Sequence, residues 1–535
     1  MAQTASQAGR IVIGLLKLFV GTLASRVLGF VRILLAARYF GCGRLMDAFY
    51  VAFMIPNLFR RVLGEQAVES SFLPVFKSLT ARDKVREAWR AASVFLNWLL
   101  VLLVLAAGLC YLFAPQLVGR VLAPGFSAPA AAQTVGLGRL MCPFMVLIGL
   151  AAFCGSLLLA HGQTLAYSAA PTLFNVGWIG VLVLTHRRLG IQSMALGVLV
   201  GGVLYLLGTV AALFWGRRRG RVQGRCDARA GFRDPHASHA MALAGPVCLA
   251  AMVDRCASVV DRAVASFLPE GSVAALGYAL PLVLLPFALF GLSIGRAALV
   301  PLSEQAGTGD TEGFRDSARV ALRLGLVLLI PLSVGTALLA SPLAVILQSR
   351  GGALDPHQTR LIAVALRYYA LGLAGMGFVS ILSRAMYALK DTQTPLRCAR
   401  VALYANVLLS AGLALTLLRH GGVALATSIA MTGQAVLLFL ALRRKLSEMG
   451  APGGLRTLWA TAWKTGLATA MMAAAVWGVA RMSGSWIGAA TLAARFARVL
   501  VPGAGGAVVF TAVMVCLDRA AVREFVRRAR GQSPR

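Results

Sequence analysis

Acidic residues are scarce in this chain of 535 residues, which has 19 aspartates and glutamates against 52 lysines and arginines. Charged residues of all kinds make up 13% of the sequence, and hydrophobic residues make up 59%. Soluble domains carry a charged fraction of about 25%, and their mean hydropathy lies far below the +0.77 of this chain. The composition therefore excludes a soluble globular protein and indicates that lipid is the main solvent.

Motifs of common enzymes are also missing. The sequence has no Walker loop, no nucleophile motif and no CxxC pair, and its six histidines are dispersed. A membrane glycosyltransferase or phosphotransferase would need an acidic metal motif and a folded loop, but the longest polar connection runs only from about Arg217 to Ser238. We therefore expect a secondary transporter and no enzyme, with no bound cofactor.

Long apolar runs follow one another along the chain. The run from Ala92 to Phe113 exceeds the roughly 20 residues that a helix needs to cross a hydrocarbon core of about 30 Å. We predict fourteen transmembrane helices, beginning near residues 10, 47, 92, 134, 164, 193, 238, 272, 315, 358, 396, 422, 458 and 495. The first run carries Arg26 and Arg32 and lacks a cleavage site, so we expect a retained helix and not a signal peptide.

The formal net charge of +33 predicts the orientation of these helices. The densest basic clusters lie at 77–90, 217–233, 443–456 and 519–535, and each follows an even-numbered span. The positive-inside rule places these clusters and both termini in the cytoplasm. Nucleic-acid binding is the alternative for a basic chain, but the position of the clusters between apolar runs favours an orientation signal.

An internal repeat is visible at a shift of about 230 residues. Pro74 then aligns near Pro301, and Asn175 aligns with Asn406. We predict an all-α integral membrane protein with two parallel six-helix bundles, 1–216 and 238–445, a basic cytoplasmic linker at 217–237, and helices 13 and 14 with a basic tail at 446–535. Two bundles that face a central site are the usual build of transporters that work by rocking.

Ionisable residues are concentrated in the first two predicted spans, although a central charge costs about 2.5 to 3.5 kcal/mol on insertion scales. They are Arg26 and Arg32 in the first span, and Asp47, Arg60, Arg61, Glu65 and Glu69 in the second. Arg61 and Glu65 lie four residues apart and could neutralise each other, but the first span has no acidic residue. We therefore predict a net positive cavity, and arginines suit a pyrophosphate better than a cationic drug because they bind phosphate oxygens in pairs.

The seventh predicted span also carries charge. Asp254 and Asp261 lie seven residues apart, hence on one helical face, with Arg255 and Arg262 beside them. Neutralisation between helices is one explanation of this pattern, and a cation or proton site coupled to transport is the other.

Several motifs resemble those of the MurJ (MviN) lipid II flippases, a family of the multidrug/oligosaccharidyl-lipid/polysaccharide exporter superfamily. They are SRVLGFVR at 25–32, DAFYVAFMIPNLFRR at 47–61, LAPGF at 122–126, PTLFN at 171–175 and YALKDTQTP at 387–395. The resemblance covers helices 1 to 12. It implies a flippase of the bacterial inner membrane that moves undecaprenyl-pyrophosphoryl-disaccharide-pentapeptide to the periplasmic leaflet for peptidoglycan assembly.

The resemblance also implies roles for individual residues. Its cavity arginines correspond to Arg26, Arg32 and Arg60, its gate or cavity acids correspond to Asp47 and Glu65, and the predicted substrate site further includes Ser25, Arg61, Arg255 and Arg262. A sodium site falls on Asp261, Asn406, Ser410, Val423 and Thr427. Some members have Asp where Ser410 stands, and losing that carboxylate weakens a site for a hard cation.

Helices 13 and 14 would form a groove for the lipid tail. Coupling to Na⁺, to H⁺ or to the membrane potential is expected. Membrane lipids and proteins of cell-wall synthesis or division are the expected further partners.

One motif departs from the family. The family usually has an Asp-Arg pair after Tyr-Ala in helix 8, where this chain has Leu280 and Pro281. The missing arginine belongs to the family's cavity, so either Arg255, Arg262 or Arg296 supplies its charge, or the substrate differs.

An exporter of another polyprenyl-linked glycan and a drug or cation antiporter are the alternatives within the superfamily. A scaffold for cell-wall enzymes would not explain arginines within the membrane.

Overall fold

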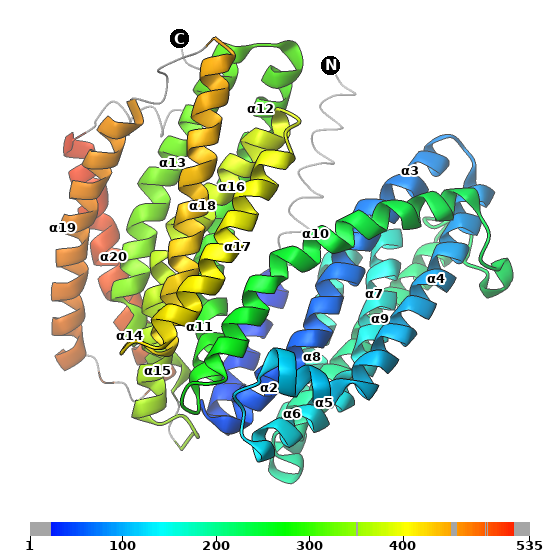
Figure 1. Cartoon of the computed structure of the whole chain (residues 1–535), viewed down its shortest axis with the longest axis horizontal. Coiled ribbons are helices and arrows are strands. Elements are labelled where there is room, and N and C mark those ends of the chain that lie inside the picture. Colours follow the sequence, from blue (N-terminus) through cyan, green and yellow to red (C-terminus); the bar gives the residue numbers. More distant parts are fainter. Residues whose placement is uncertain (1–22, 349–350, 451–456, 487, 489–490, 518–535) are drawn as a thin grey trace. The chain divides into compact units, whose positions relative to one another are not determined.

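The computed structural model describes residues 23–348, 351–450, 457–486, 488 and 491–517, and its regular elements in these ranges are helices (Figure 1). Their contacts divide the chain into two compact units, Met1–Glu270 and Gly271–Arg535. The all-α class expected from the hydrophobic pattern is confirmed.

The described part of unit 1 starts with a helix over residues 23–40. It continues with α2 (Arg44–Phe59), the π-helix η1 (Arg60–Phe72), α3 (Leu73–Ala81), α4 (Val85–Leu112), α5 (Ala114–Leu117), the π-helix η2 (Val118–Leu122), α6 (Ala128–Met141), α7 (Pro143–Ala160), α8 (Thr164–Leu189), α9 (Gln192–Arg218), the 3₁₀ turn η3 (Ala228–Ala230) and α10 (Pro235–Ala265). Asp234 caps α10, because its Oδ1 accepts hydrogen bonds from the backbone N–H groups of His236 at 3.0 Å and Ala237 at 2.9 Å. Pro235 then fits the first turn, where a backbone donor is not needed.

Glycines allow α8 and α9 to pack closely. A Cβ at Gly201 would lie 2.6 Å from the backbone O of Phe174, and one at Gly197 would lie 2.2 Å from the Trp178 ring. Side chains larger than hydrogen at these positions would therefore push the two helices apart. The close packing holds the aromatic face of α8 in a defined position.

Unit 2 contains α11 (Ser272–Pro286), the π-helix η4 (Phe287–Gly291), α12 (Leu292–Thr308), α13 (Thr311–Leu338), α14 (Ala340–Leu347), α15 (Pro356–Leu371), α16 (Leu373–Ala388), α17 (Gln393–Ala414), α18 (His420–Glu448), α19 (Thr457–Trp486) and α20 (Leu492–Leu517). The last two helices pack on each other, α19 also packs on α13, and α20 also packs on α14 (Figure 1). Helices α19 and α20, which lie outside the internal repeat, therefore form a layer on the other helices of unit 2. Leu339, Met472 and Val476 form the buried centre of this contact.

Within the described ranges, ten helices are long and apolar enough to cross a membrane. Other helical segments at 23–40, 44–81, 235–265 and 457–486 are not among these ten. Three of them, 23–40, 44–81 and 235–265, carry the concentrated charges that the sequence assigned to a site. A multi-pass membrane protein is confirmed, and the count of fourteen spans stays a prediction.

The division between the units lies after Glu270 and not within the predicted linker at 217–237. The reason is that α10, predicted to open the second bundle, packs on η1 and α4 of unit 1. The segment before α10 is also fastened to α4, because Asn97 Nδ2 donates to the backbone O of Gly231 at 2.9 Å and Trp98 Nε1 donates to that of Phe232 at 3.1 Å. The predicted linker is thus a docked part of unit 1.

Candidate substrate site

Arg32 lies within unit 1 among neutral partners. Its Nη1 donates to the side-chain oxygen of Asn175 at 3.0 Å, and its guanidinium carbon lies 4.0 Å from the centre of the Trp178 ring. An amide and an aromatic face stabilise a cation without removing its charge. In the described part of the chain, Arg32 has no acidic partner. The positive charge predicted for the first helix is therefore retained.

Asn175 is oriented by its own hydrogen bonds. Its Nδ2 donates to the backbone O of Ser25 at 3.1 Å, to Ser25 Oγ at 3.3 Å and to the backbone O of Pro171 at 3.3 Å. These bonds use the nitrogen end of the amide, so the oxygen end faces Arg32. Ser25, predicted as a site residue, therefore supports Arg32 through Asn175, an arrangement that the linear sequence did not indicate.

Two further predicted arginines approach α2 of unit 1. Arg60 Nε donates to Asn57 Oδ1 at 3.1 Å, and the Arg60 charge is close enough to Arg32 to repel it. Arg262 of α10 donates from Nη1 to the backbone O of Tyr50 at 2.9 Å. The Tyr50 hydroxyl interacts electrostatically with Arg32 and Arg262. Two chain segments thus bring positive groups to Tyr50, and Arg60 lies close to one of them, Arg32.

The remaining predicted residues of unit 1 lie in different environments. Asp47 is buried, with 4% of its surface exposed, in the first turn of α2, where the helix dipole stabilises a carboxylate. Arg26 is exposed and Arg255 is half-buried. The side chains of Arg61, Glu65 and Asp254 lie outside the described residues, so the neutralisation of Arg61 by Glu65 stays a prediction.

Four predicted sodium ligands lie together in unit 2. Asn406 Nδ2 donates to Thr427 Oγ1 at 3.3 Å, and that hydroxyl donates to the backbone O of Val423 at 3.3 Å. Ser410 is fully buried one helical turn from Asn406 on α17. Asn406 Oδ1 is buried without a hydrogen-bond partner among the described residues. The fifth predicted ligand, Asp261, is a buried residue of unit 1.

Unit 2 contains a pair of neighbouring arginines, of which the sequence predicted Arg296 and not Arg384. Leu280 and Pro281 lie within α11 and provide no charge. Arg296 of α12 and Arg384 of α16 are close enough to repel each other, and Arg384 Nη1 donates to Ser380 Oγ at 2.7 Å. Arg384 lies three residues before the start of the YALKDTQTP motif, and this position is the signal in the sequence that could have indicated it. Tyr50 and Trp178 were missed too, because their roles depend on contacts between distant helices.

The sequence matches the family model described as lipid II flippase MurJ over residues 36–495. The chain belongs to the lipid II flippase MurJ family. A lipid II flippase MurJ from Burkholderia cenocepacia is 31% identical over 444 residues, which cover 81% of this chain and 84% of the relative. A probable lipid II flippase MurJ from Rhizobium tropici is 30% identical over 431 residues, or 79% of each chain.

Solved structures agree with the MurJ assignment. A structure described as lipid II flippase MurJ in an inward closed conformation matches with a TM-score of 0.77 and 25% identity, and the match covers 94% of this chain and 99% of that chain. A multidrug resistance MATE family transporter of the MOP superfamily matches with a TM-score of 0.68 and 15% identity over 79% of this chain and 95% of its own. That second likeness shows a shared fold. The resemblance seen in the motifs is confirmed, and the other exporters of the superfamily are not better supported.

Proposed function

We propose that this chain translocates lipid II from the cytoplasmic to the periplasmic leaflet by alternating access and is no enzyme. The observation that carries the proposal is Arg32, an arginine of the helix over residues 23–40 whose neighbours orient its guanidinium without neutralising it. A diphosphate carries negative charge and presents oxygens in the geometry that guanidinium groups bind. Family membership supports the same substrate, because the relatives are named for it.

In this proposal Arg32, Arg60 and Arg262 provide a fixed positive region in unit 1, and exposed Arg26 makes the first contact with the diphosphate. Arginine is suited to this step because its charge persists at any pH a cell encounters. The polyprenyl tail remains in lipid beside α19 and α20, which expose large side chains such as Trp459 and Leu500.

The membrane potential is the proposed driving force. A cytoplasm-negative potential moves an anionic headgroup outward with about 2.3 kcal/mol per charge per 100 mV. Sodium is the proposed coupling ion, since the buried and unpaired Asn406 Oδ1 beside Thr427 is an oxygen ligand of the kind that a hard cation needs. Both termini are proposed to face the cytoplasm, as the basic clusters predict.

Complementation tests this function. Cells depleted of their own lipid II flippase would receive the wild-type chain, Arg26→Ala, Arg60→Ala or Arg188→Ala, and periplasmic exposure of lipid II would be scored. Arg188 is exposed at the end of α8 and serves as the matched control. We expect the wild type and the control to restore exposure and the two site variants to fail. A well-inserted wild type that restores nothing would point to an exporter of another substrate.

A further inference from the structure

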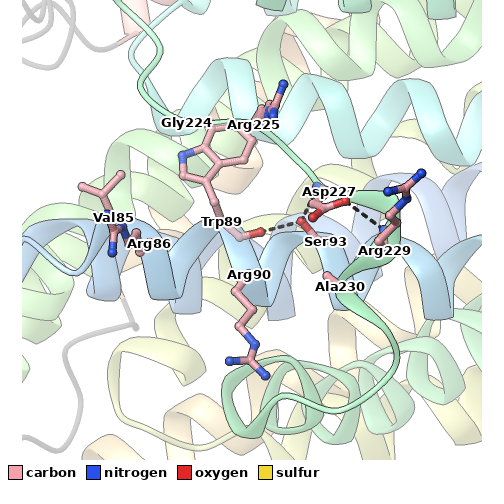
Figure 2. Close-up of a pocket in the computed structure, with 10 residues that line it drawn as sticks. All are labelled: Val85, Arg86, Trp89, Arg90, Ser93, Gly224, Arg225, Asp227, Arg229 and Ala230. Atoms are coloured by element: carbon pink, nitrogen blue, oxygen red, sulfur yellow. Dashed lines mark hydrogen bonds between the residues drawn. The ribbon is translucent and has the colours of Figure 1, made fainter.

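A pocket of about 570 Å³ lies in unit 1, between the first turns of α4 and the docked segment 219–234 (Figure 2). Four arginines line it, Arg86 and Arg90 from α4 and Arg225 and Arg229 from the segment. None of these residues belongs to the candidate substrate site. The pocket is therefore a second basic feature of the fold.

The arginines exceed the acidic groups around them. Asp227 also lines the pocket, but its Oδ1 already accepts the backbone N–H of Arg229 at 2.9 Å. Arg90 Nε lies 3.9 Å from a carboxylate oxygen of Asp234, the residue that caps α10. Glu87, which follows Arg86 on α4, pairs with Lys84 at 3.0 Å and with His236 at 3.5 Å, and not with an arginine of the pocket. The pocket keeps a net positive charge and selects anions.

Trp89 adds an unused hydrogen-bond donor. Its side chain lines the pocket and is 7% exposed, and its Nε1 has no hydrogen-bond partner among the described residues. Gly224 lies against this edge of the indole, since a Cβ there would be 2.3 Å from Nε1. A buried N–H without an acceptor is unfavourable, and an anion in the pocket would provide the acceptor.

The walls of the pocket are held in place by hydrogen bonds. Ser93 Oγ accepts the backbone N–H of Asp227 at 2.8 Å and donates to the backbone O of Trp89 at 2.7 Å (Figure 2). Nearby, burial in the same contact raises the pKa of the Cys226 thiol to about 11, so this group stays neutral and does not compete for the arginines. A preformed site loses less conformational entropy when a ligand binds.

An exposed aromatic pair lies on the same two segments that form the pocket. Trp98 of α4 is 40% exposed and packs edge to face on Phe232, which is 48% exposed, with the ring centres 5.3 Å apart. Exposed aromatic residues of this kind mark the boundary between hydrocarbon and water. Arg90 precedes Trp98 by about two turns, or roughly 12 Å of helix rise, so the pocket lies on the N-terminal, polar side of this aromatic pair.

We propose that this pocket binds the phosphate group of an anionic molecule, with the four arginines around the phosphate and Trp89 Nε1 as a further donor. Phospholipid headgroups and soluble phosphates share this chemistry. The position beside the aromatic pair favours an anionic lipid. The proposal does not depend on the proposed flippase activity, because it involves none of the residues assigned to that activity.

Equilibrium binding to the purified full-length chain in neutral detergent tests the site. The probe is a fluorescent phosphatidylglycerol, with phosphatidylcholine as the uncharged comparison and inorganic pyrophosphate as the competitor. We expect Arg86→Gln/Arg225→Gln to weaken phosphatidylglycerol binding by roughly tenfold or more, as lost charged hydrogen bonds predict. Arg219→Gln/Arg221→Gln removes the same charge from residues outside the pocket and should change affinity by less than about twofold.

Trp89→Phe keeps the ring and removes only the N–H, so it tests the pocket even if the arginine variant misfolds. We expect an affinity loss of roughly tenfold, with an unchanged gel-filtration profile. Displacement of the lipid by pyrophosphate supports a shared phosphate site, and pyrophosphate binding without lipid binding would assign the site to a soluble anion. Equal losses in the pocket and control variants, or no effect of Trp89→Phe, would overturn the proposal.

Discussion

Arg32 and Asn175 are 143 positions apart in the sequence, yet the Arg32 guanidinium donates to the Asn175 amide oxygen at 3.0 Å. A carboxylate in place of the amide would neutralise the arginine. The amide instead fixes its direction and leaves the charge available to an anionic substrate. The stacked Trp178 ring has the same effect from another side.

Replacing Asn175 should therefore impair transport without preventing insertion. We expect Asn175→Leu to lower periplasmic exposure of lipid II by roughly tenfold, because one charged hydrogen bond is lost and Arg32 is no longer oriented. Exposure of lipid II in complemented cells measures the effect. Thr209→Val is the control, since the buried Thr209 hydroxyl bonds only to carbonyls of its own helix. Equal activity of the two variants would contradict this role of Asn175.

Packing of α8 on α9 should matter for the same site. Gly201→Ala places a methyl group 2.6 Å from the backbone O of Phe174, and overpacking of this kind costs about 1 to 3 kcal/mol. We expect a lower thermal unfolding midpoint in detergent together with reduced transport. Gly180→Ala lies on α8 with no atom within 4 Å of the added carbon and should leave the midpoint unchanged or slightly higher. A destabilised Gly180→Ala and an unaffected Gly201→Ala would refute the argument.

Asp391 should make the stability of unit 2 depend on pH. The Lys445 ammonium and the backbone N–H of Thr394 hold the pKa of the Asp391 carboxyl well below its usual range. A carboxyl with a depressed folded pKa stabilises the protein above its unfolded pKa of about 3.9 and loses this contribution as pH falls through the folded pKa. We expect Asp391→Asn to be less stable than the wild type by about 1 kcal/mol at pH 7.

The thermal unfolding midpoints of both proteins, measured from pH 7 down to pH 3, check this dependence. The difference between the two midpoints should narrow below pH 4. It should be smaller at every pH when both chains also carry Lys445→Met. A gap that is constant across this range would show that the charge of Asp391 has no part in stability.

The arginine pair of unit 2 should replace the charge absent from α11. If Arg296 and Arg384 serve the substrate, Arg296→Gln and Arg384→Gln should each reduce lipid II exposure by roughly tenfold, as expected for a lost contact to phosphate. Introducing the family's residue by Pro281→Arg should partly restore activity to Arg296→Gln. Arg360→Gln, an exposed position of α15, is the control. Wild-type activity of both glutamine variants would exclude the pair and leave Arg255 or Arg262 as the substitute.

Much of this protein could be predicted because lipid imposes simple rules on sequence. A span needs a long apolar run, so the helical membrane class followed from composition, and the cost of buried charge directed attention to Arg32, Arg60 and Arg262. The motifs at 25–32 and 47–61 led to the family, which the comparisons confirmed. The position of α10 in unit 1 did not follow, because the repeat reports on similar segments and not on which surfaces they bury.

The membrane environment, the helical class, the family and the identity of the charged residues could all be inferred from the sequence, since each depends on residue type and local spacing. Tertiary structure decided which neutral groups face those charges. Asn175, Trp178 and Ser25 reach Arg32 only after distant helices pack together, and the basic segment 219–234 becomes a pocket wall only by docking on α4. The physical reason is that hydrogen bonds and packing act over a few ångströms, so their partners are set by the fold and not by proximity along the chain.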